Sequence, residues 1–421
     1  MRVLFVTVPL ASHVYPSVSL AHALQSAGHE VRLASKPGVE DLITGCGLHA
    51  VTVGMPADED HLHEGQVPID ALALDPQDEE SWRSVRRYLT PRIISANFRA
   101  EDGRGRGGVI DDLVTYCRSW QPDLVLWDPA FPAAAIAARA SGAEHGRLLW
   151  ALDTVGHIRH RTRQELGEDA APEQDPLVAA MLPALERYGV DFGEDLLLGR
   201  WSLDPVPAGG RLSAPGHTYH PMRIVPYTGS AVEPEWLRTP PTRPRVCLTY
   251  GASVRGYAPR FATVPLPVLM EAFAGMDIEV VATLNDEEIA EAGTIPDNVR
   301  TVDYLPFTQL LPTCSAIVYQ GGDGTFGCAA PQSLPQLINL SPKWGELAVA
   351  QYVESRGAGL VVEREGATAE SVRDQLHRVL TEPAFRKGAE EVCREITAMP
   401  TPHAIVPLLE KLAEKRAHAT A

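Results

Sequence analysis

Tyr319-Gln320-Gly321-Gly322-Asp323-Gly324-Thr325 is a glycine-rich turn that follows an apolar segment directly and can open a helix. Glycines let the backbone approach a phosphate closely, and the free N–H groups and dipole at a helix start favour negative charge. The Thr325 hydroxyl adds another donor. The pattern predicts a strand, a diphosphate-binding turn and a helix; the alternative is a plain strand-to-helix turn.

Apolar strands and helices alternate around this turn through the second half of the chain. We predict strands at residues 245–249, 278–283, 299–304, 316–319, 336–340 and 360–362. We predict helices at residues 264–273, after Gly324, at 346–354, and from Ser371, Ala384 and Ala404 onward. This alternation is typical of a parallel sheet with helices on both faces.

The first half has the same pattern. After an opening strand, a helix is predicted from Pro16 to Gly28, and further strands at residues 30–35, 48–53, 124–127 and 147–152. Helices are predicted at residues 39–44, 82–99, 110–120, 130–141 and 177–188. Residues 153–212 have little strand character. The acidic, aperiodic stretch from Ala57 to Glu80 is predicted to be a loop, either a mobile flap or a substrate-facing insertion.

A proline-rich segment separates the two halves. Residues 226–244 contain five prolines and no usable hydrophobic period, which is typical of a linker between domains. We predict an N-terminal α/β domain at 1–225, a second α/β domain at 245–400, and a final helix at 401–421 that packs back on the first domain. Two doubly wound, Rossmann-like domains would face each other across a cleft, with ligands at the carboxyl ends of the strands.

Composition narrows the class of protein. The net charge of −17 argues against a nucleic-acid partner, so a phosphate would be held locally. The six cysteines have no CxxC spacing and no zinc-type arrangement with histidine, which favours reduced thiols in the cytoplasm and no metal site. No apolar run approaches the ~20 residues of a membrane span, so no membrane partner is expected.

Two polar residues follow strands in the first half. His13, after the opening strand, is predicted to lie in a loop facing the cleft, where an imidazole can accept a proton near neutrality. Asp128, after another strand, could orient that ring. The alternatives are a histidine satisfied by backbone at a helix start, and an aspartate that caps the helix at Ala130. An NAD-binding Rossmann turn is disfavoured, because Pro9 to Pro16 contains no glycine and so lacks the GxGxxG fingerprint.

Taken in order, these segments resemble the inverting, nucleotide-sugar-dependent glycosyltransferases of the GT-B fold, in particular actinobacterial deoxysugar transferases that act on polyketides. The resemblance covers nearly the whole chain. Its motifs are Met1 to Thr7 with Ser12 to Pro16, Ala27 to Arg32, Leu124 to Pro129, Val225 to Gly229, Pro234 to Leu237, Val246 to Gly251 with Ser253, Leu310 to Ser315, and Gln320 to Thr325.

The resemblance implies roles for individual residues. His13 would deprotonate the acceptor, and Asp128 would hold the His13 ring in position. The donor would be a thymidine diphosphate (TDP) deoxysugar, and Phe307 would lie beside its nucleobase. The diphosphate would be held, without a metal or other cofactor, by Ser253, Gly322, Asp323, Gly324 and Thr325. Further donor-site residues would be Thr228, Gly229, Gly251, Gln320, Trp344 and Glu346.

The chain departs from the family pattern at two positions. Gln320 stands where the family usually has histidine, and glutamine can donate a hydrogen bond to phosphate but carries no charge. Trp344-Gly345-Glu346 stands where the family often has an Asp or Asp-Gln pair that contacts donor hydroxyls. Glu346 could replace that pair; the alternative is an ordinary acid in the first turn of a helix.

The sequence therefore predicts an enzyme, a glycosyltransferase of the hexosyl type that acts by inverting displacement in antibiotic biosynthesis. The acceptor would be an aromatic or macrolide polyketide, with the aromatic class favoured by the opening segment. The new bond could be to oxygen or, by C-glycosylation, to carbon. The alternative is a non-catalytic, nucleotide-sugar-binding partner of another transferase. A homodimer is compatible with the sequence, and an epimerase on the same architecture has no supporting residue.

Overall fold

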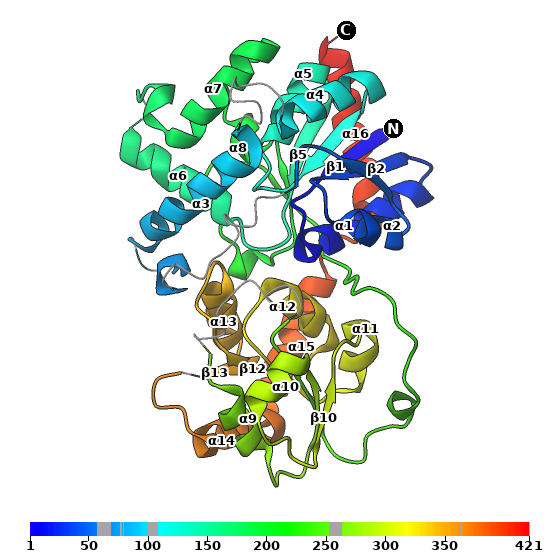
Figure 1. The fold of residues 1–421 in the computed structure, drawn as a ribbon, viewed down its shortest axis with the longest axis vertical. Coiled ribbons are helices and arrows are strands. Elements are labelled where there is room, and N and C mark those ends of the chain that lie inside the picture. The colour runs from blue at the N-terminus through cyan, green and yellow to red at the C-terminus, as the bar shows by residue number, and fades with distance from the viewer. Residues whose placement is uncertain are drawn as a thin grey trace.

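The computed structural model describes residues 1–56, 69–75, 78, 80–99, 108–167, 169–251, 263–362 and 364–420. Two α/β domains are stacked along the long axis of the molecule, with the N-terminal one above the C-terminal one in Figure 1. Each contains one parallel sheet with helices on both faces. The predicted fold, two Rossmann-like domains facing each other, is confirmed.

The first domain is built on a sheet of order β3-β2-β1-β4-β5-β6-β7 in which every described pairing is parallel. Its strands are β1 (Arg2–Val6), β2 (Glu30–Ser35), β3 (His49–Thr52), β4 (Leu124–Trp127), β5 (Glu144–Leu148), β6 (Ser202–Asp204) and β7 (Tyr219–Pro221). All four residues of β4 are buried, as expected of a strand covered on both faces.

Helices cover the two faces of this sheet. They are α1 (Ala11–Ser26), α2 (Glu40–Gly45), α3 (Ser81–Phe98), α4 (Val109–Trp120), α5 (Ala133–Ser141), α6 (Thr154–Leu166), α7 (Pro176–Tyr188) and α8 (Asp195–Leu198). Because side chains alternate along a strand, β1 contributes side chains to two separate hydrophobic cores. Leu4 and Val6 pack with α4 and α5, and Val3 and Phe5 pack with α1.

The second domain has a six-stranded parallel sheet, within the described residues, of order β10-β9-β8-β11-β12-β13. The strands are β8 (Arg245–Thr249), β9 (Glu279–Thr283), β10 (Val299–Val302), β11 (Ala316–Tyr319), β12 (Gln336–Asn339) and β13 (Gly359–Val362). The helices are α9 (Leu266–Phe273), α10 (Asp286–Ala292), α11 (Phe307–Leu310), α12 (Asp323–Ala329), α13 (Glu346–Ser355), α14 (Ala369–Thr381) and α15 (Pro383–Thr397).

Both sheets reverse their strand order at one place, between β1 and β4 in the first domain and between β8 and β11 in the second. Such a reversal opens a crevice at the carboxyl ends of the strands, where doubly wound proteins bind ligands. His13 and Asp128 follow β1 and β4, and the glycine-rich turn follows β11. The topology therefore places both predicted halves of the site at reversal points.

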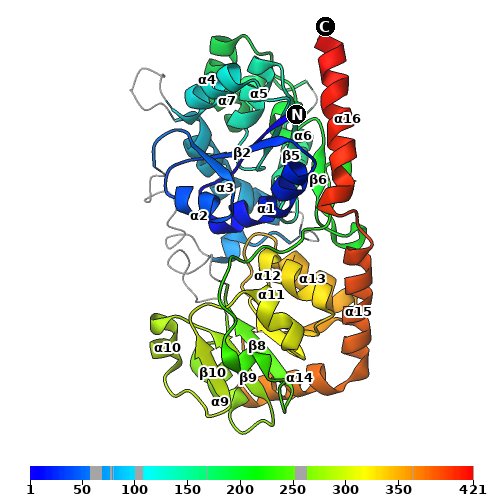
Figure 2. The ribbon, with the colours of Figure 1, turned by 90° about the vertical axis from the view of Figure 1, so that its right-hand side faces the viewer.

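The chain returns to the first domain at its end. Helix α16 (Pro402–Thr420) runs alongside the first domain in Figure 2, beyond α15. Its residues Ile405, Val406 and Leu409 are buried in the core that contains Val3 and Phe5. The proline-rich segment 226–244 contains no described strand, only the 3₁₀ turn Glu235–Arg238. No described helix combines the length and apolarity that crossing a membrane requires.

Several element boundaries differ from the sequence prediction. Helix α1 begins at Ala11, five residues before Pro16, and Pro16 lies inside the helix, where it has no N–H to donate to the carbonyl four residues earlier. Strand β5 lies at Glu144–Leu148 instead of residues 147–152, and β6 and β7 lie in or just after a region predicted to lack strands. Helix α10 was missed, and α5 begins at Ala133 instead of Ala130.

Candidate active site

A cleft of about 1070 Å³ lies between the two domains, at the carboxyl ends of both sheets. All the predicted site residues except Gly229 and Ser253 line it. Ser253 and much of the predicted flap, Ala57 to Glu80, lie outside the described residues. Gly229 adjoins the cleft lining, because a Cβ built on it would stand 2.9 Å from the hydroxyl of Tyr304.

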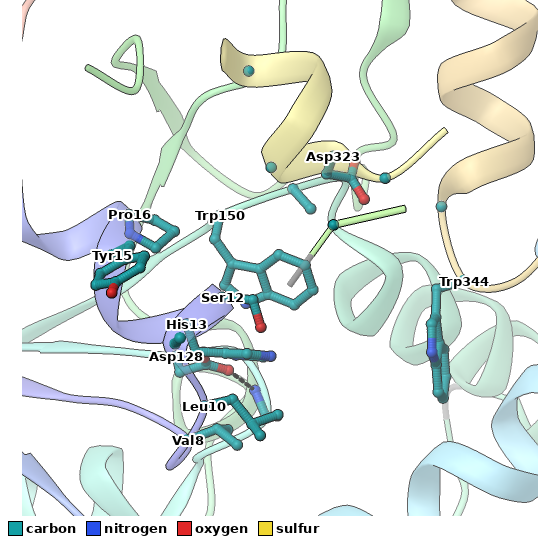
Figure 3. A pocket seen from close by; sticks show the side chains of 18 of the residues that line it. Val8, Leu10, Ser12, His13, Tyr15, Pro16, Asp128, Trp150, Asp323 and Trp344 are labelled. Carbon is teal, nitrogen blue, oxygen red and sulfur yellow. Dashed lines mark hydrogen bonds and ion pairs between the residues drawn. The ribbon is translucent and has the colours of Figure 1, made fainter. Parts of the chain in front are cut away.

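His13 and Asp128 form a hydrogen bond on the first-domain wall (Figure 3). His13 Nδ1 and Asp128 Oδ2 are 2.5 Å apart, and Asp128 Oδ1 accepts a hydrogen bond from the Ala130 amide at 2.9 Å. The prediction that His13 lies in a loop is wrong, since it occupies the first turn of α1. With Nδ1–H donated to the carboxylate, Nε2 is the nitrogen left to accept a proton.

Trp150 is a wall residue that the sequence did not indicate. Its ring centroid lies 4.4 Å from that of His13, with the planes inclined by 57°. The residue follows β5, at a strand end, and Figure 3 shows its ring beside His13. The sequence predicted a strand that continues to Leu152, so Trp150 was expected inside a strand and not after its end. The indole limits how the imidazole can turn and adds an apolar surface beside the proposed base.

The glycine-rich turn has one position that requires glycine. Gly321 has φ +99°, a left-handed conformation that L side chains rarely adopt. Gly322 is extended, with φ −62° and ψ 136°, and it caps α12. A Cβ at Gly322 would lie 2.9 Å from Gln320 Nε2, so its small size leaves room for that amide.

Gln320 lies inside the second-domain wall with 6% of its surface exposed. Besides Gly322, it adjoins Gly251, on which a Cβ would stand 3.2 Å from Gln320 Nε2 and 3.9 Å from Thr325 Oγ1. Its Oε1 is buried and has no hydrogen-bond partner among the described residues. Gln320, Gly251 and Thr325 therefore converge on one region of the cleft.

Two carboxyl groups share this wall. Burial raises the pKa of Asp323 to about 7, against the opposite effect of hydrogen bonds from its own backbone and from that of Leu152 across the cleft. Glu346 is buried in the first turn of α13, and its Oε1 would lie 3.8 Å from a Cβ on Gly322. Glu346 thus fits both of its predicted descriptions, a first-turn acid and a cleft residue.

Trp344 connects the domains. It has φ +51°, its amide donates to the carbonyl of Leu72 at 2.8 Å, and its carbonyl accepts from the amide of Leu74 at 3.1 Å. It packs against the buried cluster of Leu74, Trp82, Val85 and Ile158, and the guanidinium of Arg92 lies 5.8 Å from the ring centroid. Figure 3 shows Trp344 on the opposite side of the cleft from His13.

Phe307 and Thr228 complete the predicted positions. Phe307 opens α11 on the second-domain wall, and the Thr228 carbonyl accepts a hydrogen bond from Tyr304. The basic side chains of the described lining are Lys36, Arg92, Arg99 and Lys343, none of which the sequence analysis singled out. No described group of three or more His, Cys, Asp or Glu side chains could hold a metal ion.

Two facing Rossmann-like domains, with a cleft at their strand reversals and an imidazole opposite a glycine-rich turn, define a glycosyltransferase of the GT-B fold. The chain matches the erythromycin biosynthesis protein CIII-like N-terminal domain over residues 22–251 and the corresponding C-terminal domain over residues 267–412. It belongs to that family. The resemblance inferred from the motifs and the prediction of a glycosyltransferase are both confirmed.

Among curated relatives, the chain is 40% identical to aclacinomycin-T 2-deoxy-L-fucose transferase of Streptomyces galilaeus, over 98% of this chain and 96% of the relative. It is also 40% identical to 10-deoxymethynolide desosaminyltransferase of Streptomyces venezuelae, over 98% and 97% of the two chains. The structure of the glycosyltransferase VinC in complex with dTDP superimposes with a TM-score of 0.85 at 37% identity, over 99% and 100% of the two chains.

Proposed function

We propose that this enzyme transfers a deoxysugar from a TDP-sugar to a polyketide aglycone with inversion at the anomeric carbon. The observation that carries the proposal is the opposition of the His13–Asp128 pair, 2.5 Å apart, to the glycine-rich turn across one cleft. The VinC structure with dTDP supports the choice of nucleotide. Relatives named for deoxysugar transfer to aclacinomycin and methynolide compounds support the choice of sugar and acceptor.

The reaction follows from this arrangement. His13 Nε2 takes the proton from the acceptor while Asp128 stabilises the imidazolium that forms. The acceptor atom attacks the anomeric carbon as the bond to the diphosphate breaks, and the leaving group carries the electron pair. Because base and leaving group occupy opposite walls, the attack comes from the face opposite the diphosphate, which inverts the configuration.

The acceptor wall suits a large apolar aglycone. Val8, Leu10, Trp150 and Phe131 line the first-domain side of the cleft, and Ile93 adds to them from α3. Such surfaces bind through burial of apolar area, while a few polar groups fix the orientation. The reacting hydroxyl or phenol would then lie near His13.

The test is incubation with a panel of TDP-deoxysugars and of aromatic and macrolactone aglycones, followed by mass spectrometry. We expect a product heavier than the aglycone by one deoxysugar residue, with inverted anomeric configuration by NMR. Acid lability of the product distinguishes a bond to oxygen from a bond to carbon. Tight binding of TDP without product from any acceptor would contradict catalysis and favour a non-catalytic, nucleotide-binding protein.

A further inference from the structure

We propose that Lys343 binds the donor, its ammonium group neutralising the diphosphate, an inference that rests on the proposed function. Lys343 lies after β12, the strand that pairs with β11. The Ser341 amide in the same loop donates to the carbonyl of Gln320 at 3.1 Å, and the Lys343 carbonyl accepts from the Glu346 amide at 3.1 Å. The loop that carries Lys343 is therefore hydrogen-bonded to the glycine-rich turn.

The burial of Lys343 is the second observation. Only 6% of its surface is exposed, yet the residue lines the cleft. Within the described part of the chain, its ammonium group forms no ion pair or hydrogen bond. Burying a charged group without a partner is costly, and lysine is rarely buried unless it is paired. An anion bound in the cleft would supply the missing counter-charge.

Other buried cations in the protein are paired. Arg147 bonds Asp153 at 2.5 and 2.9 Å, and Arg245 bonds Glu279 at 3.1 Å. These arginines fit the general rule that buried charges have partners. Lys343 differs from them in two respects, since it lacks a carboxylate partner among the described residues and lies in a ligand cleft.

The surroundings identify the anion as the diphosphate. Among the basic residues of the described cleft lining, Lys343 is the one contributed by the second domain, where the glycine-rich turn lies. Gln320 at that turn is neutral, and the carboxyl groups of Asp323 and Glu346 on the same wall supply no positive charge to phosphate. A lysine acts on phosphate as a point charge, and charge on the leaving group increases as the sugar departs.

The experiment is isothermal titration of Lys343→Met and Lys343→Arg with TDP and, at millimolar concentration, with uncharged thymidine. Methionine keeps most of the length of the side chain and removes the charge. Because a hydrogen bond to a charged group is lost, we expect Lys343→Met to weaken TDP binding by roughly 10- to 100-fold. Thymidine binding should be unchanged, and Lys343→Arg should stay within a few-fold of the wild type.

Lys36→Met is the matched control, because it removes the same charge from the first-domain side of the same cleft. It should leave TDP affinity unchanged. TDP binding by Lys343→Met at wild-type strength would overturn the inference while leaving the proposed function intact. Equal losses for TDP and thymidine would also overturn it, because the residue would then shape the site and not bind phosphate. Failure of the wild type to bind TDP would instead contradict the proposed function.

Discussion

At the scale of single residues, His13 is expected to control the chemical step and not donor binding. It lies on the first-domain wall, with Nδ1 held by Asp128, whereas the predicted diphosphate site belongs to the second domain. We predict that His13→Ala lowers kcat by ~10²–10⁴-fold, the usual contribution of a general base. Asp128→Asn should have a weaker effect in the same direction.

TDP affinity of both variants, measured by titration calorimetry, should equal that of the wild type. Ser95→Ala changes another first-domain cleft residue and serves as the control. Turnover by His13→Ala at the wild-type rate would exclude His13 as the base.

Asp323 gives a prediction about pH. Its pKa is raised to about 7 in the folded protein from an ordinary value of 3.8. Between these pH values the folded state keeps a proton that the unfolded state has lost, so the contribution of Asp323 to stability is complete below about pH 4 and falls as the pH rises through 7. Asparagine resembles the protonated form.

We therefore expect Asp323→Asn to raise the Tm relative to the wild type at pH 8 more than at pH 4. Thermal unfolding at the two pH values measures this difference. Asp297→Asn, at an exposed aspartate of the same domain, is the control and should show no such trend. If the Tm of Asp323→Asn differed from that of the wild type by the same small amount at both pH values, this result would contradict the raised pKa of Asp323.

At the scale of elements, the turn between β11 and α12 depends on Gly321 and not on Gly322 for its backbone conformation. At φ +99°, a side chain is strained by about 1–2 kcal/mol, and a Cβ would also approach Ile338 Cγ2 at 3.3 Å. We predict that Gly321→Ala lowers the free energy of unfolding by at least this amount, measured by urea denaturation.

Gly324→Ala is the matched control, because Gly324 lies within α12 and a Cβ there meets nothing within 4 Å. It should stabilise the protein by roughly 0.5–1 kcal/mol, since alanine is the better helix former. Equal effects of the two substitutions would show that the left-handed conformation of Gly321 is unimportant.

The elements also show how far the sequence could predict the structure. Strands rich in buried apolar residues, such as β4 and β11, were predicted at their true positions because parallel strands covered on both faces are continuous apolar runs. The predicted position of strand β5 was wrong because this strand buries charged residues whose partners are distant in the sequence. Glu144 accepts from Trp201 Nε1, and Arg147 bonds Ser202 as well as Asp153.

The sequence predicted some residues of the site and not others, for the same physical reason. Residues in local motifs, such as His13 and the glycine-rich turn, were predicted to lie in a cleft, and they line one. Trp150 and Lys343 were not predicted, because each acquires its place from contacts and burial that only the assembled fold creates. A lysine beside a tryptophan, Lys343-Trp344, has no distinctive pattern in the sequence.

At the scale of the whole molecule, the last helix stabilises the first domain. Leu409 of α16 is fully buried in the core formed by β1 and α1. We predict that Leu409→Ala lowers the free energy of unfolding by about 2–5 kcal/mol, the usual cost of removing a buried leucine side chain. Scanning calorimetry should show the loss in the transition of the first domain, although Leu409 lies near the end of the sequence.

Lys411→Ala, at an exposed position of the same helix, is the control and should change stability by less than about 0.5 kcal/mol. If Leu409→Ala destabilised only the second domain, the energetic role assigned to α16 would be wrong.

The return of α16 means that the backbone passes between the domains twice, after β7 and again after α15. These two passages meet where the Arg223 amide donates to the Pro400 carbonyl at 3.0 Å. Two crossings that meet at one side of the molecule can act as a hinge between the domains. We expect such a hinge to let the two domains open and close while it resists sliding or twisting of one domain against the other. A bulky aglycone would then enter and leave on the side of the cleft opposite the hinge. His13 and the nucleotide would return to the same relative position each time the domains close.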